Sequence, residues 1–533
     1  MNAKCMFAAI ALVMAQNAGG TAAAYDVAEK DVAELQADMR AGYVSSESIT
    51  RAYIARIGAI DRSGPSLHSV IAINPDAEQQ ARARDAARKA GKARGLLFGI
   101  PLLVKDNVET ADPMATTAGS LALANNITHR DAPFVARLRA AGAVILGKTN
   151  LSEWANIRSA RSISGWSALG GLVKNPYVLD RSACGSSSGS AAAVAASLAA
   201  AAIGTETDGS LVCPGSVNGI VSLKPTVGLV SRRYVVPISH SQDTPGPMGR
   251  SVADVAILLT AMAGTDAADS ATASANARKT DYFAALAHAR LGGKRIGVLH
   301  TDNSAAAEED AVFARAVLAL KKAGAVLVPV SYVPPDAKTS GDAELLELET
   351  ELKVDLDSYL AATPPSVTTR SLAEIIAFDD ANAREHALFG QDIFVAAVKT
   401  GGLRDAAYLQ ARALLAKLAR GLDKMLQDNR LDALAMPTDE PSWRIDLVKG
   451  DNDSSNTSFL PAIAGYPHLT VPMGYVRGLP VGLSFIGRPW SEASLLGLGA
   501  AFERATHARH APAFRPSLES APDALAALRP VTR

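Results

Sequence analysis

Two stretches of this chain repeat the same order of helix, glycine and strand. Residues 132–150 (APFVARLRAAGAVILGKTN) and 311–330 (AVFARAVLALKKAGAVLVPV) each begin with apolar residues at helical spacing and end in a short apolar run. The glycine between the two parts is typical of a helix end. A further run, GLLFGIPLLVKDN at residues 95–107, indicates a buried strand that ends at Lys105. This alternation predicts an α/β fold with a largely parallel sheet covered by helices.

The distribution of apolar segments predicts one interrupted domain rather than two sequential ones. At 533 residues the chain exceeds the usual size of a simple core. Core-like segments occupy about 70–260 and return at about 455–500, whereas about 270–430 is mostly charged, amphipathic helix. Residues 265–280 are small and polar, which favours a surface loop or linker. We expect a single large domain over residues 25–533, interrupted by a helical variable region.

Residues 1–24 have the features of a secretory signal peptide. Lys4 gives a short positive region, residues 5–15 are apolar, and small residues precede a cleavage site after Ala24. A retained transmembrane helix would need about 20 apolar residues, and no other stretch of the sequence has that length and apolarity. We therefore expect an exported protein, periplasmic or secreted, without membrane contact once the signal is removed.

Charge and cysteine content argue against several classes of function. Lys plus Arg and Asp plus Glu both number 53, and no basic stripe indicates nucleic-acid binding. The sequence has neither a CxxC pair nor an HExxH motif, so we expect no metal and no other cofactor. Without the signal, only Cys184 and Cys213 remain. Whether they form a disulfide is open, and the apolar neighbours of Cys213 favour a packed thiol.

The run GAVILGKT at residues 142–149 matches the P-loop pattern. A phosphate-binding loop needs a strand before its first glycine and a turning loop after it. Here a helix precedes Gly142, and residues 143–146 are themselves the expected strand. We interpret the match as a coincidence.

The run GSSSG at residues 185–189 matches the nucleophile elbow of α/β-hydrolases. In that interpretation Ser187 is the nucleophile, and a histidine such as His468 is its base. The preceding VKNPYVLDRSAC is polar and makes a poor buried strand, which argues against an elbow. The long apolar run that follows predicts a buried helix and argues against a flexible linker.

A third interpretation joins the serine cluster to Lys105 and to GTETDGS at residues 204–210. Residues 207–210 are expected to form a tight turn, in which Gly209 permits unusual backbone angles. Successive backbone N–H groups in such a turn can form an oxyanion hole, and a serine there can attack a carbonyl carbon once its proton is removed. A lysine at the end of an apolar strand is desolvated, which favours the neutral amine that can act as a base.

Four motifs, in order, resemble those of the amidase signature family: GIPLLVKDN, CGSSSGSAAAVAA, GTETDGSLVCP and LPVGLSFIGRP. The likeness covers most of the chain from about 30 to 500 and is weakest from about 270 to 430. Within the family it is closest to bacterial peptide amidase, which has runs similar to NPYVLDRS and SQDTPGPM (241–248). The resemblance implies a single α/β domain with a mixed, twisted central sheet covered by helices on both faces.

The resemblance also implies roles for individual residues. The family's catalytic lysine falls on Lys105, its bridging serine, which follows a cis peptide bond, on Ser186, and its nucleophile on Ser210. The oxyanion donors would be the backbone amides of Thr207, Asp208, Gly209 and Ser210. In this scheme Lys105 accepts the proton of Ser186 while Ser186 accepts that of Ser210, and water later hydrolyses the acyl-enzyme.

Three further positions concern the substrate. By its family position Trp154 would line the pocket, but a core tryptophan fits the sequence equally well. Asp208 replaces a common glycine, so its carboxylate must point away from the developing negative charge. Val212 and Cys213 stand where some relatives carry an arginine that binds a substrate carboxylate. This difference argues against small anionic substrates and against transamidation of charged tRNA.

The resemblance therefore predicts a cofactor-free amidase whose partner is a small-molecule or peptide amide. The expected reaction is hydrolysis of C-terminal peptide carboxamides to acid and ammonia. A broader amidase for aryl, alkyl or oligoamide substrates is the alternative within the family. An α/β-hydrolase-type esterase with a histidine base and a non-catalytic binding protein are alternatives of other classes. The preferred side chains and the oligomeric state cannot be read from the sequence.

Overall fold

The computed structural model describes most of the chain: residues 25–299, 307–331, 336–452, 457–520, 525 and 528. The expected signal peptide, residues 1–24, lies outside the described residues. Within the described part, none of the helices combines the length and the apolarity that a membrane crossing requires.

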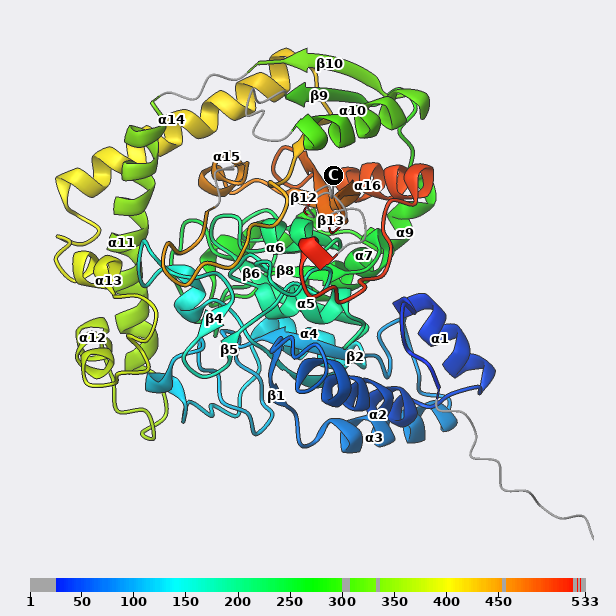
Figure 1. Ribbon diagram of the computed structural model, residues 1–533, viewed down its shortest axis with the longest axis horizontal. Coiled ribbons are helices and arrows are strands. Elements are labelled where there is room, and N and C mark those ends of the chain that lie inside the picture. The colour runs from blue at the N-terminus through cyan, green and yellow to red at the C-terminus, as the bar shows by residue number, and fades with distance from the viewer. Residues whose placement is uncertain are drawn as a thin grey trace, which may run out of the picture.

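A mixed sheet of 11 strands forms the centre of the described structure, in the order β1-β3-β2-β6-β8-β7-β12-β13-β11-β9-β10 (Figure 1). Its strands are β1 (Val70–Ile73), β2 (Pro101–Lys105), β3 (Val144–Thr149), β6 (Ala201–Glu206), β7 (Val221–Lys224), β8 (Thr244–Gly249), β9 (Arg295–Leu299), β10 (Val326–Val330), β11 (Ala433–Pro437), β12 (His468–Val476) and β13 (Leu479–Ile486). A separate small sheet pairs β4 (Trp166–Ser167) with β5 (Gly171–Leu172).

The mixed α/β architecture that the resemblance implies is confirmed, whereas the expectation of a largely parallel sheet is wrong. Parallel pairing joins β3, β2 and β6 in one part of the sheet and β11, β9 and β10 at its other end. All pairs from β6 through β8, β7, β12 and β13 to β11 are antiparallel, as is β1 with β3. Helix-and-strand alternation identifies only the parallel units, because neighbours such as β12 and β13 are joined by a short turn.

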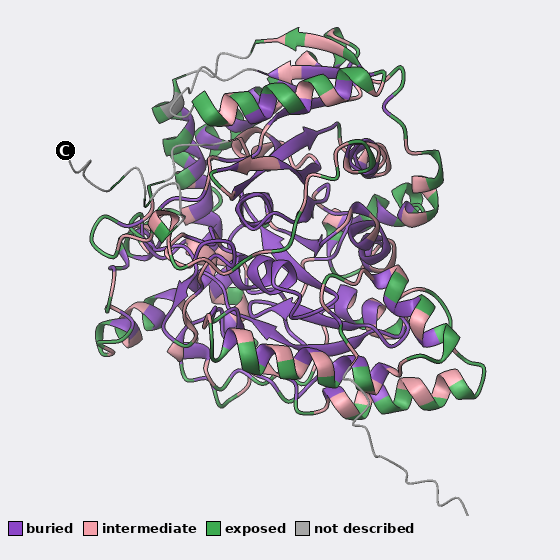
Figure 2. Ribbon diagram, turned by 45° about the vertical axis from the view of Figure 1, so that its right-hand side comes forward, coloured by how far each residue is buried: buried purple, intermediate pink, exposed green. Residues whose placement is uncertain are grey.

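Helices pack around this sheet. They are α1 (Val32–Ala41), α2 (Ser46–Arg56), α3 (Ala77–Lys89), α4 (Pro133–Ala140), α5 (Ser188–Ala195), α6 (Val212–Val217), α7 (Val252–Met262), α8 (Ala275–Arg278), α9 (Tyr282–Ala285), α10 (Ala307–Lys322), α11 (Ala337–Ala361), α12 (Leu372–Asp380), α13 (Asp392–Ala397), α14 (Ala406–Asp428), α15 (Phe459–Ile463) and α16 (Glu492–Thr506). Helices α11 to α14 lie together at one side of the molecule, in yellow-green and yellow in Figure 1. Figure 2 shows that the central strands are buried, whereas exposed residues gather on the outer helices and on the edge strand β10.

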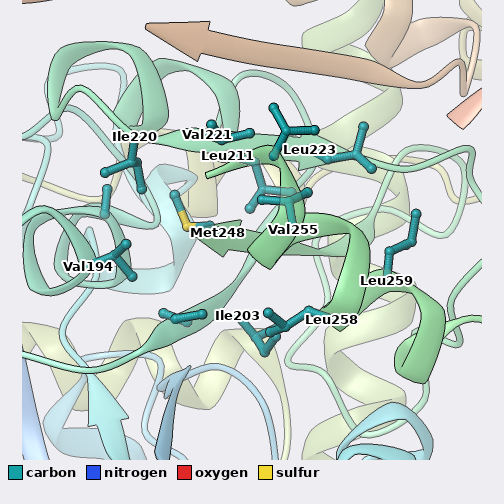
Figure 3. Close-up of a cluster of buried hydrophobic side chains, with 14 of the residues drawn as sticks. Val194, Ile203, Leu211, Ile220, Val221, Leu223, Met248, Val255, Leu258 and Leu259 are labelled. Atoms are coloured by element: carbon teal, nitrogen blue, oxygen red, sulfur yellow. The ribbon is translucent and has the colours of Figure 1, made fainter. Parts of the chain in front are cut away.

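The main apolar core lies around strands β6, β7 and β8 (Figure 3). Its labelled side chains are Val194, Ile203, Leu211, Ile220, Val221, Leu223, Met248, Val255, Leu258 and Leu259. Helix α5 consists of small residues and Val194, all of them buried, so its backbone can approach the sheet closely. At Gly189 a Cβ atom would lie 2.3 Å from the carbonyl oxygen of Ser69, so only glycine fits this contact. Close packing of α5 fixes the serine cluster at its amino end.

The P-loop-like run is a helix end followed by a strand. Helix α4 ends at Ala140, and β3 spans Val144–Thr149. Lys148 is buried, and its Nζ donates hydrogen bonds to the Val108 carbonyl oxygen at 2.7 Å and to Thr116 Oγ1 at 2.9 Å. The lysine thus fastens a neighbouring loop to the sheet, and the run is no phosphate-binding loop.

Residues 265–280, expected to be a surface loop or linker, are partly ordered into short helical turns. A 3₁₀ turn at Ser270–Ser274 leads directly into α8. Asp269 is buried and accepts a hydrogen bond from Arg232 Nη2 at 2.5 Å. The segment is attached to the core by this ion pair, so it is not a free linker.

Candidate active site

Three elements bring Lys105, Ser186 and Ser210 together. Lys105 is the last residue of β2, and β6, its parallel neighbour, leads after Glu206 into the loop that carries Ser210. Ser186 lies in the turn before α5, the helix that packs on β6 and β2. Because parallel strands end at the same edge of a sheet, the lysine and the loop meet there. The structure thus places the three predicted side chains in one site.

A chain of hydrogen bonds joins these side chains. Lys105 Nζ lies 2.8 Å from Ser186 Oγ, and the Ser186 hydroxyl donates to Ser210 Oγ at 2.9 Å. The peptide bond between Gly185 and Ser186 is cis. The geometry allows a proton to move from Ser210 through Ser186 to the amine.

The surroundings of Lys105 favour a neutral amine. The lysine is fully buried, and besides Ser186 Oγ its Nζ contacts Ser187 Oγ at 3.0 Å, Thr205 Oγ1 at 3.0 Å and the Thr205 carbonyl oxygen at 3.2 Å. Burial lowers the pKa of Lys105 to about 7, against the opposing effect of the nearby carboxyl groups of Asp243 and Glu206. A substantial fraction of the amine is therefore unprotonated at neutral pH and can act as a base.

The loop that carries Ser210 is anchored at both ends by carboxyl groups, those of Glu206 and Asp243. Glu206 accepts hydrogen bonds from the backbone N–H groups of Leu211 at 2.7 Å and Val212 at 3.1 Å. Thr207 Oγ1 donates to Asp243 at 2.6 Å. These contacts hold the loop residues in a fixed conformation, as preorganised oxyanion donors require.

Inside this loop, Gly209 has a positive φ of 77°, which glycine adopts without strain. The neighbouring Asp208 forms a side-chain hydrogen bond with Glu344 of α11. Burial raises the pKa of Glu344 well above its usual value, and the charge of Asp208 adds to this effect. Gln242 Nε2 also donates to Glu344 at 2.9 Å. The replacement of the family's glycine by Asp208 is thus accommodated by contacts with the helical region.

A cavity of about 410 Å³ opens onto Ser210. Its lining comprises Ala155, Asn156, Ile157, Ser159, Ala160, Ser162, Ser164, Cys184, Gly185, Thr207, Asp208, Gly209, Ser210, Val212, Cys213, Ile238, Leu348, Thr438, Asp439, Trp443, Asp451, Thr457 and Ser458. The residues come from the loop after β6 and the start of α6, the turn before α5, the segment after β3, the segment before β8, helix α11 and the segment after β11. The four expected oxyanion residues, Ser210 among them, therefore all line the space that a substrate can enter.

Cys184 and Cys213 form a disulfide with their Cα atoms 6.1 Å apart. The interpretation of Cys213 as a packed thiol is therefore wrong. One cysteine precedes the cis peptide at Ser186, and the other lies in the first turn of α6, the helix that follows Ser210, so the bond joins the two serine-bearing segments. The sequence offered one signal, namely that each cysteine lies within three residues of a predicted catalytic serine.

Trp154 is a core residue rather than a cavity residue in the described structure. Its ring packs edge-to-face on Phe394 of α13, with 5.8 Å between the ring centroids. The three residues that follow it, Ala155, Asn156 and Ile157, line the cavity instead. Of the two positions that the sequence allowed for this tryptophan, in the pocket or in the core, the structure favours the core.

The elbow interpretation of Ser187 with a histidine base is wrong. Ser187 Oγ donates to the Thr205 carbonyl oxygen at 3.0 Å and lies beside Lys105. His468 is buried in β12, where its Nε2 lies 2.6 Å from Ser484 Oγ. Burial lowers the pKa of His468 to about 3, so this ring stays neutral and is engaged elsewhere.

Sequence reasoning missed three residues of the site. Thr205 contacts Lys105 through both oxygen atoms, and Asn107 Nδ2 donates to Thr205 Oγ1 at 2.9 Å. Asp243 anchors Thr207 and acts on the charge of Lys105. Asn107 and Asp243 stand in the runs GIPLLVKDN and SQDTPGPM, so the motifs contained them, but no local pattern indicated their partners.

Comparison with known proteins identifies the family. A family model described as amidase matches residues 48–496. The structure of a native peptide amidase from Stenotrophomonas maltophilia is 52% identical, covers 91% of this chain and 99% of that one, and superposes with a TM-score of 0.87. A peptide amidase in complex with the competitive inhibitor chymostatin is 51% identical, with the same coverage and a TM-score of 0.88.

A more distant relative agrees with this result. A probable amidase from Arabidopsis thaliana is 37% identical over 92% of both chains. The matched region contains the lysine at the end of β2, the serine turn before α5 and the loop after β6. This chain therefore belongs to the amidase signature family and is a hydrolase of carbon–nitrogen amide bonds.

Proposed function

We propose that this amidase hydrolyses the C-terminal carboxamide of peptides, with Ser210 as nucleophile, Ser186 as bridging serine and Lys105 as base. The hydrogen-bonded chain from Lys105 to Ser210, which ends at the cavity, carries the proposal. The likeness to two peptide amidase structures supports the substrate class. The cavity has a volume of about 410 Å³, which is large enough to admit the end of a peptide.

The reaction follows from the contacts of these side chains. Neutral Lys105 accepts the proton of Ser186 while Ser186 accepts that of Ser210, and Ser210 Oγ attacks the amide carbon. The backbone N–H groups of residues 207–210 stabilise the oxyanion. The proton then returns through Ser186 to the leaving nitrogen, the carbon–nitrogen bond breaks, and ammonia departs. Water attacks the acyl-enzyme by the same proton path and releases the acid, so the cycle needs no cofactor.

We also propose that the protein is exported. The signal-like pattern of residues 1–24 supports this localisation, and so does the disulfide, because such bonds persist mainly in oxidising compartments. Fractionation of the source cells, followed by amino-terminal sequencing, tests it. A mature protein that begins near Tyr25 outside the cytoplasm is expected, and an uncleaved cytoplasmic protein would contradict export.

A substrate panel tests the peptide-amide proposal. Ammonia and acid release are measured for blocked dipeptide amides, simple alkyl amides and aryl anilides at equal concentration. We expect the dipeptide amides to give the highest kcat/KM. If they are not cleaved while anilides are, the chain is a broader amidase and the peptide assignment is wrong.

A further inference from the structure

The charged residues that line the cavity all have the same sign. They are Asp208, Asp439 and Asp451, and no lysine, arginine or histidine is part of the lining in the described portion of the chain. Asp208 belongs to the oxyanion loop and is hydrogen-bonded to Glu344. The other two carboxyl groups have no part in the proposed proton path.

Asp439 lies two residues beyond the end of β11, against the disulfide. It is only 5% exposed, and one of its carboxylate oxygens lies within 4.8 Å of the sulfur atoms of Cys184 and Cys213. Its Oδ1 accepts a hydrogen bond from the backbone N–H of Glu440 at 2.9 Å. The disulfide joins the segments that carry Ser186 and Ser210, so this carboxyl group belongs to the inner wall beside the reacting atoms.

Asp451 is held on the cavity wall by two other lining residues. Its carboxylate accepts hydrogen bonds from the Ser164 backbone N–H at 3.0 Å and from Trp443 Nε1 at 3.1 Å. These donors are neutral, so they fix the position of the carboxylate without neutralising its charge.

Two arginines that are close in sequence to lining residues, Arg158 and Arg161, are not part of the lining. Arg158 is fully buried and forms ion pairs with Glu153 at 2.7 Å and with Glu385 at 3.2 Å. Arg161 is exposed, and it is not part of the lining although both of its chain neighbours are. A cavity with charges of one sign and low-dielectric walls concentrates the field inside it.

We propose that this acidic lining selects peptide amides by charge, favouring a cationic residue at the carboxamide end, accepting a neutral one and rejecting one with a carboxylate. This inference rests on the proposed peptide-amidase function and names its substrate class more closely. The same charges distinguish a peptide amide from a free peptide acid, because the acid carries a C-terminal carboxylate that Asp439 and Asp451 repel. Hydrolysis creates such a carboxylate, so the same field promotes release of the product.

Three N-acetylated dipeptide amides that differ only in the last residue test the proposal: alanyl-lysinamide, alanyl-norleucinamide and alanyl-glutamic acid α-amide. Norleucine matches lysine without its ammonium group. At pH 7.5 we expect kcat/KM to fall in the order lysine, norleucine, glutamate. The values for the lysine and glutamate substrates should differ by on the order of tenfold, as expected for one unscreened charge pair several ångströms apart. Equal values, or a preference for glutamate, would overturn the inference.

The outcome for norleucine separates this inference from the proposed function. Cleavage of the norleucine peptide supports the peptide-amidase assignment whatever the charge preference. If none of the three is cleaved, that assignment fails, and the charge preference is then measured by how strongly each peptide inhibits hydrolysis of a neutral anilide. Stronger inhibition by the lysine peptide still supports the inference, whereas equal inhibition overturns it.

A pair of matched variants localises the effect. Asp439→Asn keeps the acceptor for the Glu440 N–H and removes one cavity charge, so the lysine-to-glutamate ratio of kcat/KM is expected to fall about threefold or more. Asp446→Asn removes an exposed carboxylate from the same segment, outside the lining, and is expected to leave the ratio unchanged. A lowered ratio in the Asp446 variant, or an unchanged ratio in a folded Asp439 variant, would contradict the assignment to the cavity wall.

Discussion

The catalytic edge of the sheet and the helical region α11–α14 are built in different ways. At the catalytic edge, the side chains are small or fully buried, and each polar atom of the proton path has a partner within 3.2 Å. The helical region contains two long helices, α11 and α14, and α11 carries a row of buried carboxyl groups that includes Glu344, Glu347 and Glu351. The first region contains the proposed proton path, and the second contacts it through Glu344 and Leu348. The effects of mutations in the two regions should therefore differ in size and in the property that they change.

The largest effect is expected at the catalytic edge. Ser210→Ala removes the proposed nucleophile, and Lys105→Met removes the proposed base while keeping a long apolar chain, so each should lower kcat by roughly 10³-fold or more. Ammonia release measures the effect, and circular dichroism confirms that the variants are folded. Undiminished activity in folded Lys105→Met would refute the role of the lysine.

The next largest effect concerns stability. Replacing both cysteines, Cys184→Ala with Cys213→Ala, opens a loop of 29 residues and should cost about 3 kcal/mol of unfolding free energy. Denaturant unfolding measures this loss. The helical region has no disulfide among its described residues, so a reductant should leave its own packing untouched. A double variant as stable as the parent would show that the bond does not stabilise the site.

A smaller effect at the catalytic edge concerns the pH dependence of activity, and it distinguishes the charge of Asp243 from the geometry of the loop that Asp243 anchors. Burial raises the pKa of Asp243 to about 6, so this group is mostly ionised at neutral pH, and its charge raises the pKa of Lys105. In the proposed mechanism activity needs the neutral amine of Lys105, so it should fall as pH drops below about 7. In Asp243→Asn the pKa of Lys105 falls, so the acid limb of kcat/KM should move to lower pH by up to about one unit.

Thr207→Val is the matched control for this shift. It removes the hydrogen bond to Asp243 and keeps the carboxyl group, but loss of this bond raises the pKa of Asp243 and so weakens its charge near neutral pH. We expect a lower kcat, with the acid limb moved less than in Asp243→Asn. If both variants move the limb equally, the effect comes from loop geometry rather than from charge.

The smallest effect is expected where the helical region contacts the oxyanion loop. Glu344→Gln keeps the size of the side chain and removes an ionisable group beside Asp208. Burial holds the pKa of Glu344 above its usual value, so at high pH its ionisation adds negative charge near the developing oxyanion. Between pH 7 and pH 10 both proteins should lose activity, and the loss in the variant should be about two- to fivefold smaller than the loss in the parent. Identical alkaline profiles would show that this contact is only structural.

The catalytic edge could be predicted from sequence because each of its parts is local. The strand ending at Lys105, the serine turn and the glycine-containing loop are short runs with their own composition, and the family resemblance put them in order. The antiparallel centre of the sheet was not predicted, because no helix separates strands such as β12 and β13. The contact between Asp208 and Glu344 was not predicted either, because no sequence pattern joins residues so far apart in the chain.

Two other features show the limits of sequence reasoning. The number of cysteines permitted one disulfide without requiring it, since only the fold brings Cys184 and Cys213 to bonding distance. Trp154 precedes three cavity residues, but the direction of its ring depends on Phe394, which lies in a distant helix. In both cases the deciding partner is distant in the sequence.

The position of the disulfide has a practical consequence for preparing the enzyme. Chains made in a reducing cytosol would carry two thiols where the oxidised protein has a covalent link across its reaction centre. Batches that differ in thiol content are then mixtures of two molecules with different stability. Titration of free thiols should accompany every specific-activity measurement, so that incomplete oxidation is not mistaken for a mutational defect.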